Sequence, residues 1–179
     1  MKNKLIIILL FFLIKSSLFA NSITIQSKNI SLDKNKEISI FEKNVEIVTE
    51  NNNKIKSDYA EYNKKTGFLR LKNNIVAVNN EGDIIETEYA EYNEKTKIFL
   101  SIGPTKIITS KNYILEGSDI KFDNLKNFII SNKNAIVTDK ENNKIYLENY
   151  EYLIEENIFK SVGKIEIVDS IDNKYEFSQ

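Results

Sequence analysis

Two short, nearly identical stretches hold the side chains best suited to acid–base chemistry. Tyr59–Tyr62 reads YAEY, and Tyr89–Tyr92 repeats it thirty residues later. A carboxylate flanked by two phenols could move a proton during a reaction. A catalytic group is needed once, however, whereas a structural residue returns at the period of a repeated fold. Glu61 and Glu91 are therefore interpreted as surface residues of a repeat, and we predict no catalytic residue.

The residue types and motifs argue against a metal site, a cofactor site and a phosphate-binding loop. The chain contains no His and no Cys, which are the usual residues for proton transfer at neutral pH, thiol nucleophiles and zinc ligation. Asp33 and Asn35 lack the spacing and ligand number of a calcium loop. Ile102–Lys106 (IGPTK) has one glycine and no helix after it, unlike a phosphate-cradling loop. We predict neither a metal nor a cofactor.

Residues 1–20 have the pattern of a secretory signal peptide. Lys2 and Lys4 precede the unbroken apolar run Leu5–Ile14, and small residues follow before Asn21. This order predicts export, with cleavage after Ala20. The alternative is an uncleaved membrane anchor, although the apolar run is shorter than the ~20 residues that a span needs. The remaining residues, 21–179, are expected to form one domain.

The charge balance argues against a nucleic-acid partner. Removal of residues 1–20 takes away three lysines and no acidic residue, which changes the net charge from −1 to −4. A mildly acidic chain without a run of basic residues binds nucleic acid poorly. We therefore predict no nucleic-acid binding.

Apolar residues recur every thirty positions through about five copies. The columns are Ile30, Ala60, Ala90, Ile120 and Tyr150; Leu32, Tyr62, Tyr92, Phe122 and Tyr152; Ile38, Phe68, Ile98, Phe128 and Ile158; Ile47, Ala77, Ile107, Val137 and Ile167; and Ile55, Ile85, Leu115, Ile145 and Tyr175. A period in this range indicates stacked supersecondary units, each of which buries its apolar face against its neighbours.

Each unit reads as two strands joined by turns. Stretches such as IVAV and KIEIV are rich in β-branched residues that alternate with polar ones. Two kinds of Asn-, Asp- and Gly-rich turn recur, represented by Asn63–Gly67 and Asn79–Asp83. No window after the signal peptide keeps helical spacing. An up-and-down β-meander is therefore expected.

The parity of the apolar positions predicts a bend in every long strand. Around the first kind of turn the inward residues are expected to be even-numbered: Tyr62, Phe68, Tyr92, Ile98 and Leu100. Around the second kind they are expected to be odd-numbered: Ile75, Ala77, Ile85, Ile107 and Leu115. Because a strand cannot change phase without a bulge, we place a corner between the two sets. The expected corners are Lys43–Asn44, Asn73–Asn74, Gly103–Pro104, Lys133–Asn134 and Gly163–Lys164, with Ser57–Asp58, Thr87–Glu88 and Gly117–Ser118 on the return strands.

These features predict an all-β protein, an elongated two-sheet β-jelly roll built from strand–turn–strand repeats of roughly thirty residues. Facing sheets lie ~10 Å apart, so splayed sheets could hold an acyl chain, although a packed core explains each residue equally well. The candidate lipid-binding residues are Ile38, Ile47, Ile55, Phe68, Ala77, Ile85, Ile98, Leu100, Ile107, Leu115 and Phe128. Unpaired terminal strands also predict end-to-end pairing.

Two alternatives from other classes remain. A self-assembling β-scaffold would have a filled core without room for a ligand. A carbohydrate-processing β-solenoid enzyme would need a single carboxylate cluster that interrupts the repeat, and the sequence shows none.

Three long segments resemble the OstA-like family of lipopolysaccharide-transport proteins. They are Lys56–Val78 (KSDYAEYNKKTGFLRLKNNIVAV), Glu86–Ile107 (ETEYAEYNEKTKIFLSIGPTKI) and Glu116–Val137 (EGSDIKFDNLKNFIISNKNAIV). Their cadence of strand, Asp/Glu-x-Ala-x-Tyr, turn and strand is similar to that family's over Ile23–Phe177. The family's Gly-Asn-Val corners appear here as Asn73-Asn74-Ile75 and Gly103-Pro104-Thr105, which departs from the usual pattern.

The resemblance implies a non-catalytic periplasmic protein that binds lipopolysaccharide. It implies partners among the other jelly-roll proteins of the transport bridge (LptA, LptC and LptD types) and head-to-tail homo-oligomers. The LptA type and the N-terminal domain of the LptD type are the first interpretation, the latter with an outer-membrane association and a natural chain that continues past Gln179. An LptC-type component that keeps an inner-membrane anchor is the alternative.

Overall fold

A computed structural model describes residues 23–49 and 51–177, and these form strands and turns only. The strands are β1 (Thr24–Gln26), β2 (Asn29–Asp33), β3 (Ile38–Val48), β4 (Lys54–Asn63), β5 (Phe68–Val78), β6 (Ile84–Asn93), β7 (Ile98–Ser101), β8 (Pro104–Ile108), β9 (Ile114–Ser118), β10 (Lys121–Asp123), β11 (Phe128–Ser131), β12 (Ala135–Thr138), β13 (Lys144–Leu153), β14 (Ile158–Val168) and β15 (Lys174–Phe177). Within those residues we find no helix of the length and apolar character that a membrane span requires. The predicted all-β class is confirmed.

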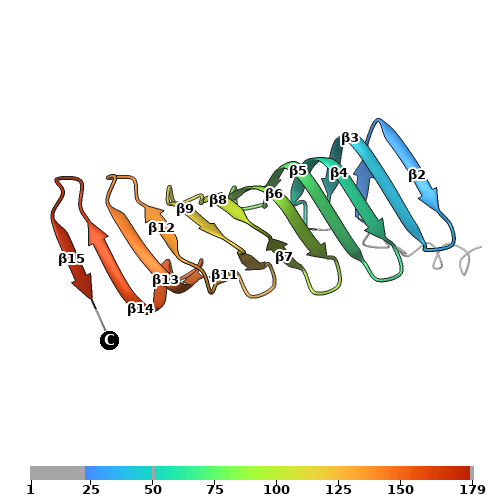
Figure 1. Ribbon diagram of the computed structural model, residues 1–179. Coiled ribbons are helices and arrows are strands. Elements are labelled where there is room, and N and C mark those ends of the chain that lie inside the picture. Colours follow the sequence, from blue (N-terminus) through green and yellow to red (C-terminus); the bar gives the residue numbers. More distant parts are fainter. Residues whose placement is uncertain (1–22, 50, 178–179) are drawn as a thin grey trace, which may run out of the picture.

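All fifteen strands belong to one antiparallel sheet. Strands that are neighbours in sequence are neighbours in space, so the sheet extends as a ladder along the molecule from β2 to β15 (Figure 1). Four rungs of the ladder are each split into two shorter strands, namely β1 with β2, β7 with β8, β9 with β10, and β11 with β12. Each unit of about thirty residues therefore supplies two rungs, as the repeat predicted. The outgoing rung, such as β5, runs from the first kind of turn to the second, and the returning rung, such as β6, runs back.

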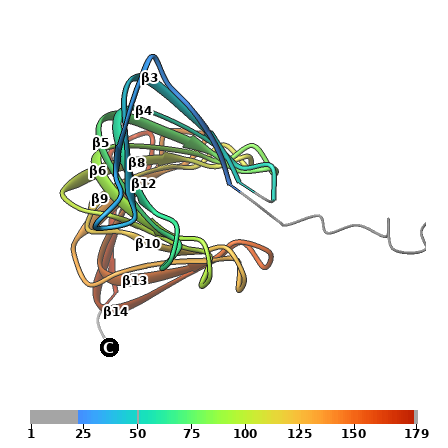
Figure 2. The same cartoon turned by 90° about the vertical axis from the view of Figure 1, so that its right-hand side faces the viewer.

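The sheet is folded over along its length. Viewed along the ladder, its strands form a V with the bends at the closed side and the hairpin turns at the open side (Figure 2). We call the half that ends in the turns after Asp33, Asn63, Asn93, Asp123 and Leu153 the first-turn arm. The half that ends in the turns after Thr49, Asn79, Thr109, Asp139 and Asp169 is the second-turn arm. The open side between the two rows of turns is the mouth.

Short polar side chains at the start of each turn explain why the chain reverses there. In the first-turn arm, the Oδ1 of Asn63 accepts the backbone N–H of Thr66 at 3.0 Å. In the second-turn arm, the Oδ1 of Asp139 accepts that of Asn143 at 2.9 Å. Such Asx turns satisfy backbone donors that the ladder leaves free. Equivalent bonds recur at Asp33, Asn79, Asn93, Asp123 and Asp169.

Left-handed backbone makes the corners in the outgoing strands. Asn73 and Asn74 have φ values of 63° and 52°, and Lys43 and Asn44 have the same conformation in β3. Gly103 and Gly163 take the corresponding position with φ of 84° and 114°. The strand register shifts between Lys72 and Ile75 as expected for a bulge. Four of the five corners predicted in the outgoing strands therefore have left-handed backbone, whereas at Lys133–Asn134 the chain passes from β11 to β12 without it.

The predicted change of phase occurs in only half of the strands. The returning strand β6 changes from odd to even inward residues, since Ile85 and Ala90 are both buried. The outgoing strand β5 keeps odd residues inward on both sides of its corner, Leu71 and Ile75. The expectation of a phase change in every long strand was therefore wrong, because two left-handed residues turn β5 without changing which face its odd residues present.

Candidate functional site

The interior of the V is filled by one apolar cluster that continues along the molecule. It extends from Phe41 and Val45 in β3 to Tyr152 and Ile154 at the end of β13. Most of its members are less than 5% exposed. Both arms supply residues, so burial of this surface holds the two halves of the sheet against each other.

Six candidate lipid-binding residues lie in this interior. Their exposed fractions lie between 0% and 9%, and all six come from the second-turn arm. They are Ile47, Ile55, Ala77, Ile85, Ile107 and Leu115. The structure brings them together in consecutive rungs, for example Ile47 beside Ile55 and Ile107 beside Leu115.

The other five candidates lie on the outer face of the first-turn arm, contrary to the expected orientation. They are the half-buried residues Ile38, Phe68, Ile98, Leu100 and Phe128. Adjacent residues of a strand point to opposite faces, and the neighbours Leu69, Phe99 and Ile129 are the buried ones. Phe68 instead lies under the Arg70 guanidinium, 5.7 Å from the ring centroid to Cζ.

The length of the turn explains this difference. Asn63 pairs with Phe68 across a turn of four residues, so even residues of β4 pair with odd residues of β5. Tyr62 is therefore beside Leu69, and Tyr92 is beside Phe99. The interior residues that sequence reasoning missed are Leu69, Leu71, Phe99 and Ile129. Counting the turn residues before assigning the parity would have identified them.

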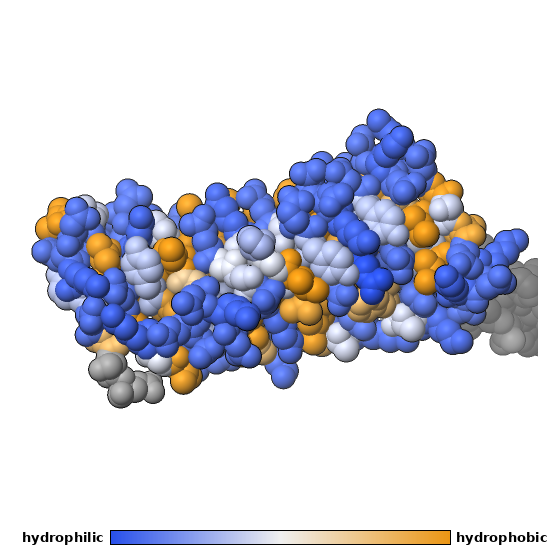
Figure 3. Space-filling model, viewed as in Figure 1, coloured by the Kyte–Doolittle hydropathy of each residue, from blue (hydrophilic) through white to orange (hydrophobic). Residues whose placement is uncertain are grey.

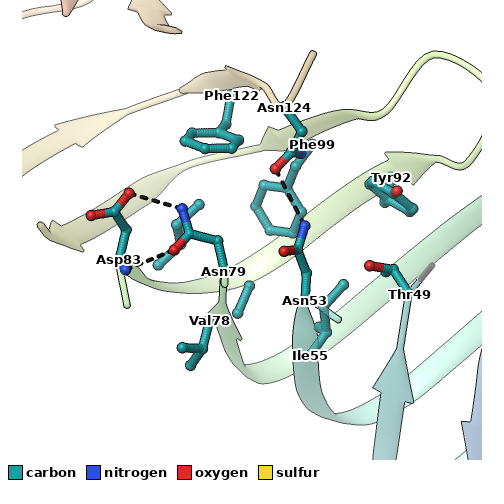
Figure 4. A pocket seen from close by; sticks show the side chains of 12 residues that line it. Thr49, Asn53, Ile55, Val78, Asn79, Asp83, Tyr92, Phe99, Phe122 and Asn124 are labelled. Carbon is teal, nitrogen blue, oxygen red and sulfur yellow. Dashed lines mark hydrogen bonds between the residues drawn. The ribbon is translucent and has the colours of Figure 1, made fainter. Parts of the chain in front are cut away.

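The packed interior leaves little free space. A cavity of about 30 Å³ lies where the mouth meets the core, lined by side chains of both arms (Figure 4). Ile55, Tyr92, Phe99 and Phe122 form much of its wall, and Asn53, Asn79 and Asn124 lie at its rim. At about 10–15 Å³ for each water molecule, this volume holds two or three of them. The arms must separate before an acyl chain can enter between them.

Polar contacts close the mouth in its central part and toward the C-terminus. The Nδ2 of Asn53 donates to the Oδ1 of Asn124 at 3.3 Å, between turns of opposite arms (Figure 4). Farther along, the Nζ of Lys111 donates to the carbonyl oxygens of Ile154 at 2.6 Å and Glu155 at 3.4 Å. Asn157 also donates to the hydroxyl of Tyr113 at 3.4 Å. These few bonds are the cross-mouth hydrogen bonds.

Apolar side chains of the inward face are exposed at both ends of the ladder. Ile30 and Leu32 in β2 are 58% and 66% exposed, and they pair with the inward Phe41 and Ser39 of β3. Tyr175 and Phe177 in β15 are 49% and 55% exposed, opposite Ile167 and Ile165. The apolar interior is therefore open at its two ends, and it is filled between them.

The repeated YAEY stretches form a polar network on the outside of the sheet. Tyr59 donates to Glu61 at 3.4 Å, and Tyr89 donates to Glu91 at 3.3 Å. Arg70 lies between the two carboxylates, at 3.5 Å from Glu61 and 3.7 Å from Glu91. Burial raises the pKa of both phenols, so they stay protonated and act as donors at neutral pH.

Two interior tyrosines titrate abnormally because of burial. Burial, together with the charge of Asp83, raises the pKa of Tyr152 to about 12. Burial alone raises the pKa of Tyr150, whose hydroxyl has no hydrogen-bond partner. The hydroxyl of Tyr152 donates to the Oδ1 of Asn157 at 2.9 Å. Among residues 23–49 and 51–177 there is also no group of three side chains able to hold a metal ion.

The outer face is predominantly hydrophilic with isolated apolar patches (Figure 3). The outer positions of the first-turn arm alternate between apolar residues and the Asn or Asp that begins a turn, as in Phe68 beside Asn93. The polar residues separate the apolar side chains of the outer face from one another. Among the described residues, the apolar side chains form a continuous cluster in the interior.

Comparison with known proteins gives a family and distant similarities to several solved structures. No curated protein sequence matches the chain. The periplasmic protein LptH of Pseudomonas aeruginosa, the LptA homologue of its lipopolysaccharide transport device, is similar with 11% identity and a TM-score of 0.36, over 89% of this chain and 96% of that one. The TCP10 domain of CPAP from Danio rerio, in complex with a STIL peptide, has 6% identity and a TM-score of 0.17, over 88% and 100% of the two chains.

The family assignment rests on a different finding. The model of a family described as "Lipopolysaccharide-assembly, LptC-related" matches residues 20–129, which is more than half of the chain. This match confirms the resemblance to lipopolysaccharide-transport proteins. The family's description names the LptC type, which was the alternative to the LptA and LptD types. The chain belongs to the LptC-related lipopolysaccharide-assembly family.

Proposed function

We propose that this chain is a periplasmic carrier that holds lipopolysaccharide acyl chains between the two arms of the V. As a member of its family, the chain is a component of lipopolysaccharide assembly and not an enzyme. The observation that carries the proposal is the continuous apolar interior, which ends at both extremities in exposed apolar side chains. An acyl chain could enter at one end and leave at the other without crossing a polar barrier.

Opening of the mouth is the conformational step that this function needs. The 30 Å³ cavity is too small for an acyl chain. The cross-mouth hydrogen bonds are few, and each neutral one contributes only about 0.5–1.5 kcal/mol. The strands of each arm are hydrogen-bonded to their neighbours within one sheet, so the arms can separate at the mouth while the ladder remains intact. An entering acyl chain would replace the core contacts that are lost.

The terminal strands supply surfaces for neighbouring jelly rolls. Among the described residues, β15 pairs only with β14, and β2 pairs only with β3. The free edge of each offers backbone donors and acceptors to another strand. Pairing there would also cover Leu32 and Phe177 and continue the apolar interior into the next protein. We therefore include edge-to-edge contact with transport partners, or with a second copy, in the proposed function.

The proposed location follows from the export pattern. The predicted signal peptide, residues 1–20, lies outside the described residues. Cleavage would release a periplasmic protein, whereas retention would give an inner-membrane-anchored component of the LptC type. Intact-mass analysis of the exported protein separates the two: a mass that includes residues 1–20 would reject cleavage.

Site-specific photocrosslinking to lipopolysaccharide tests the carrier function. A photoreactive amino acid at Leu32, Ile85 or Leu115 reports on the inward face, and one at Phe68 or Ile98 is the matched control on the outer face. We expect lipid adducts at the inward positions and at least about fivefold fewer at the outer ones, because acyl chains avoid water. Circular dichroism confirms that each variant is folded.

The same experiment examines the second candidate, a self-assembling scaffold without lipid. The filled interior favours that interpretation. Absence of adducts at all inward positions in folded variants would reject the carrier and leave the scaffold.

A further inference from the structure

A hollow lies at the N-terminal end of the first-turn arm, where its first two turns are neighbours. Its volume is about 620 Å³, and it is bounded by β2, β3 and the turn that follows β4. Lys34 lines it from the first turn, and Lys64 and Lys65 line it from the second. Lys34 and Lys64 are thirty residues apart in sequence, and stacking of the repeats brings them, with Lys65, into one site.

The charge of this hollow is positive. Within residues 23–49 and 51–177, none of Lys34, Lys64 and Lys65 forms an ion pair. Of the two acidic side chains in the lining, Asp33 is paired with Lys36 at 3.8 Å and Glu37 is exposed. A further ammonium group is close, because the Nζ of Lys95 donates to the carbonyl oxygen of Lys65 at 2.9 Å.

An apolar surface borders the lysines. Leu32 lines the hollow and is 66% exposed. It pairs with Ser39, whose other neighbour is the inward Tyr62, so Leu32 is at the open end of the apolar interior. The hollow thus combines cationic groups with the entrance to an apolar core. That combination is complementary to a lipid with a phosphorylated headgroup.

The opposite row of turns has the opposite sign. In the described second turns the charged residues are Glu81, Asp83, Lys111, Asp139, Lys140, Glu141, Asp169 and Asp172. The last turn of the first-turn arm carries Glu155 and Glu156. An anionic headgroup is therefore attracted to the N-terminal hollow and repelled from the acidic turns.

We propose that Lys34, Lys64 and Lys65 bind a phosphate group of a lipid headgroup whose acyl chains lie between the arms. The assignment rests on the proposed carrier function and adds a headgroup site to it. Lysine ammonium groups act on phosphate as point charges on flexible stems. Three of them in one hollow allow headgroups of different size to bind without a rigid fork.

Equilibrium binding of the full chain to lipid A in detergent micelles tests the site. The variant K34Q/K64Q/K65Q is compared with K140Q/K144Q/K160Q, which removes the same charge at the far end of the ladder. For lipid A with two phosphates we expect the first variant to bind about 10- to 100-fold more weakly. The control should change by less than about threefold, since these lysines are distant from the hollow.

Lipid A without phosphates and inorganic phosphate complete the design. We expect the dephosphorylated lipid to bind both variants and the unmodified chain equally, because only the acyl contacts remain. Two outcomes would overturn the headgroup site while leaving the carrier function in place. One is an equal loss of lipid A affinity in both variants. The other is that the lysines affect the binding of inorganic phosphate but not that of lipid A. If neither lipid binds the unmodified chain, the carrier function itself fails.

Discussion

At the scale of single residues, neighbours in one strand have opposite roles. Leu69 is fully buried in the interior, whereas Phe68 is half-buried on the outer face under Arg70. Composition does not distinguish the two, since both are large and apolar. Their contributions to stability are nevertheless expected to differ, because only Leu69 leaves a cavity in the packed core when it is truncated.

Alanine substitution at the two positions tests this assignment of faces. We expect Leu69→Ala to lower the free energy of unfolding by about 2–5 kcal/mol. Phe68→Ala should lower it by less than about 1.5 kcal/mol, since the ring stays partly in water and loses one contact with an exposed cation. Urea unfolding followed by circular dichroism measures both. A larger loss of unfolding free energy for Phe68→Ala than for Leu69→Ala would mean that even-numbered residues face the interior after the turn.

At the scale of strands, the corners decide whether the sheet folds over. The outgoing strand β5 turns through Asn73 and Asn74, both in the left-handed region. Asn tolerates this conformation better than other residues with a side chain, and glycine adopts it freely. The same corner in later repeats uses Gly103 and Gly163. The corner thus requires a backbone conformation, and its residue types follow from that requirement.

Substitution of Asn73 tests the corner because its side chain is exposed. Asn73→Val should destabilise the fold by about 1–2 kcal/mol, since a β-branched residue is strained at a φ of 63°. Asn73→Gly is the control and should change stability by only a few tenths of a kcal/mol. Chemical denaturation provides the measurement. A Val variant as stable as the Gly variant would show that β5 does not need the left-handed turn.

At the scale of the whole molecule, an open ladder has two unprotected ends. β15 at the C-terminal end has an unpaired edge, and its inward residues Tyr175 and Phe177 are about half exposed. At the other end, β2 presents Ile30 and Leu32 in the same way. The two ends can therefore pair with each other, since each offers an unpaired strand edge next to an apolar surface. Head-to-tail contact would bury both.

A charged variant of the last strand tests this contact. For the unmodified chain we expect self-association that increases with concentration in sedimentation velocity experiments. Tyr175→Lys/Phe177→Lys should shift the chain to monomer, because two ammonium groups would otherwise be buried without partners. Ile171→Lys is the matched control, since Ile171 is 77% exposed in a turn at the same end but outside the strand. Equal loss of association in the control, or a monomeric unmodified chain, would contradict the model of edge pairing.

Much of this architecture could be predicted because it repeats. The thirty-residue period, the two kinds of turn and the corners at Asn73–Asn74 and Gly103–Pro104 all appear in the structure. Six of the eleven candidate interior residues are in the core, all in the second-turn arm. There the turn that joins Val78 to Ile84 has five residues, so paired residues keep the same parity.

The sequence by itself determined the all-β class, the repeat and the positions of the turns, because these depend on local backbone preferences and on a period that one chain displays. Only the tertiary structure decided which face of each strand is inside, since a four-residue turn reverses the parity and a left-handed pair can bend a strand without changing it. The cationic hollow also required the fold. Lys34 and Lys64 are thirty residues apart in the sequence, and the stacking of successive turns places them around one hollow.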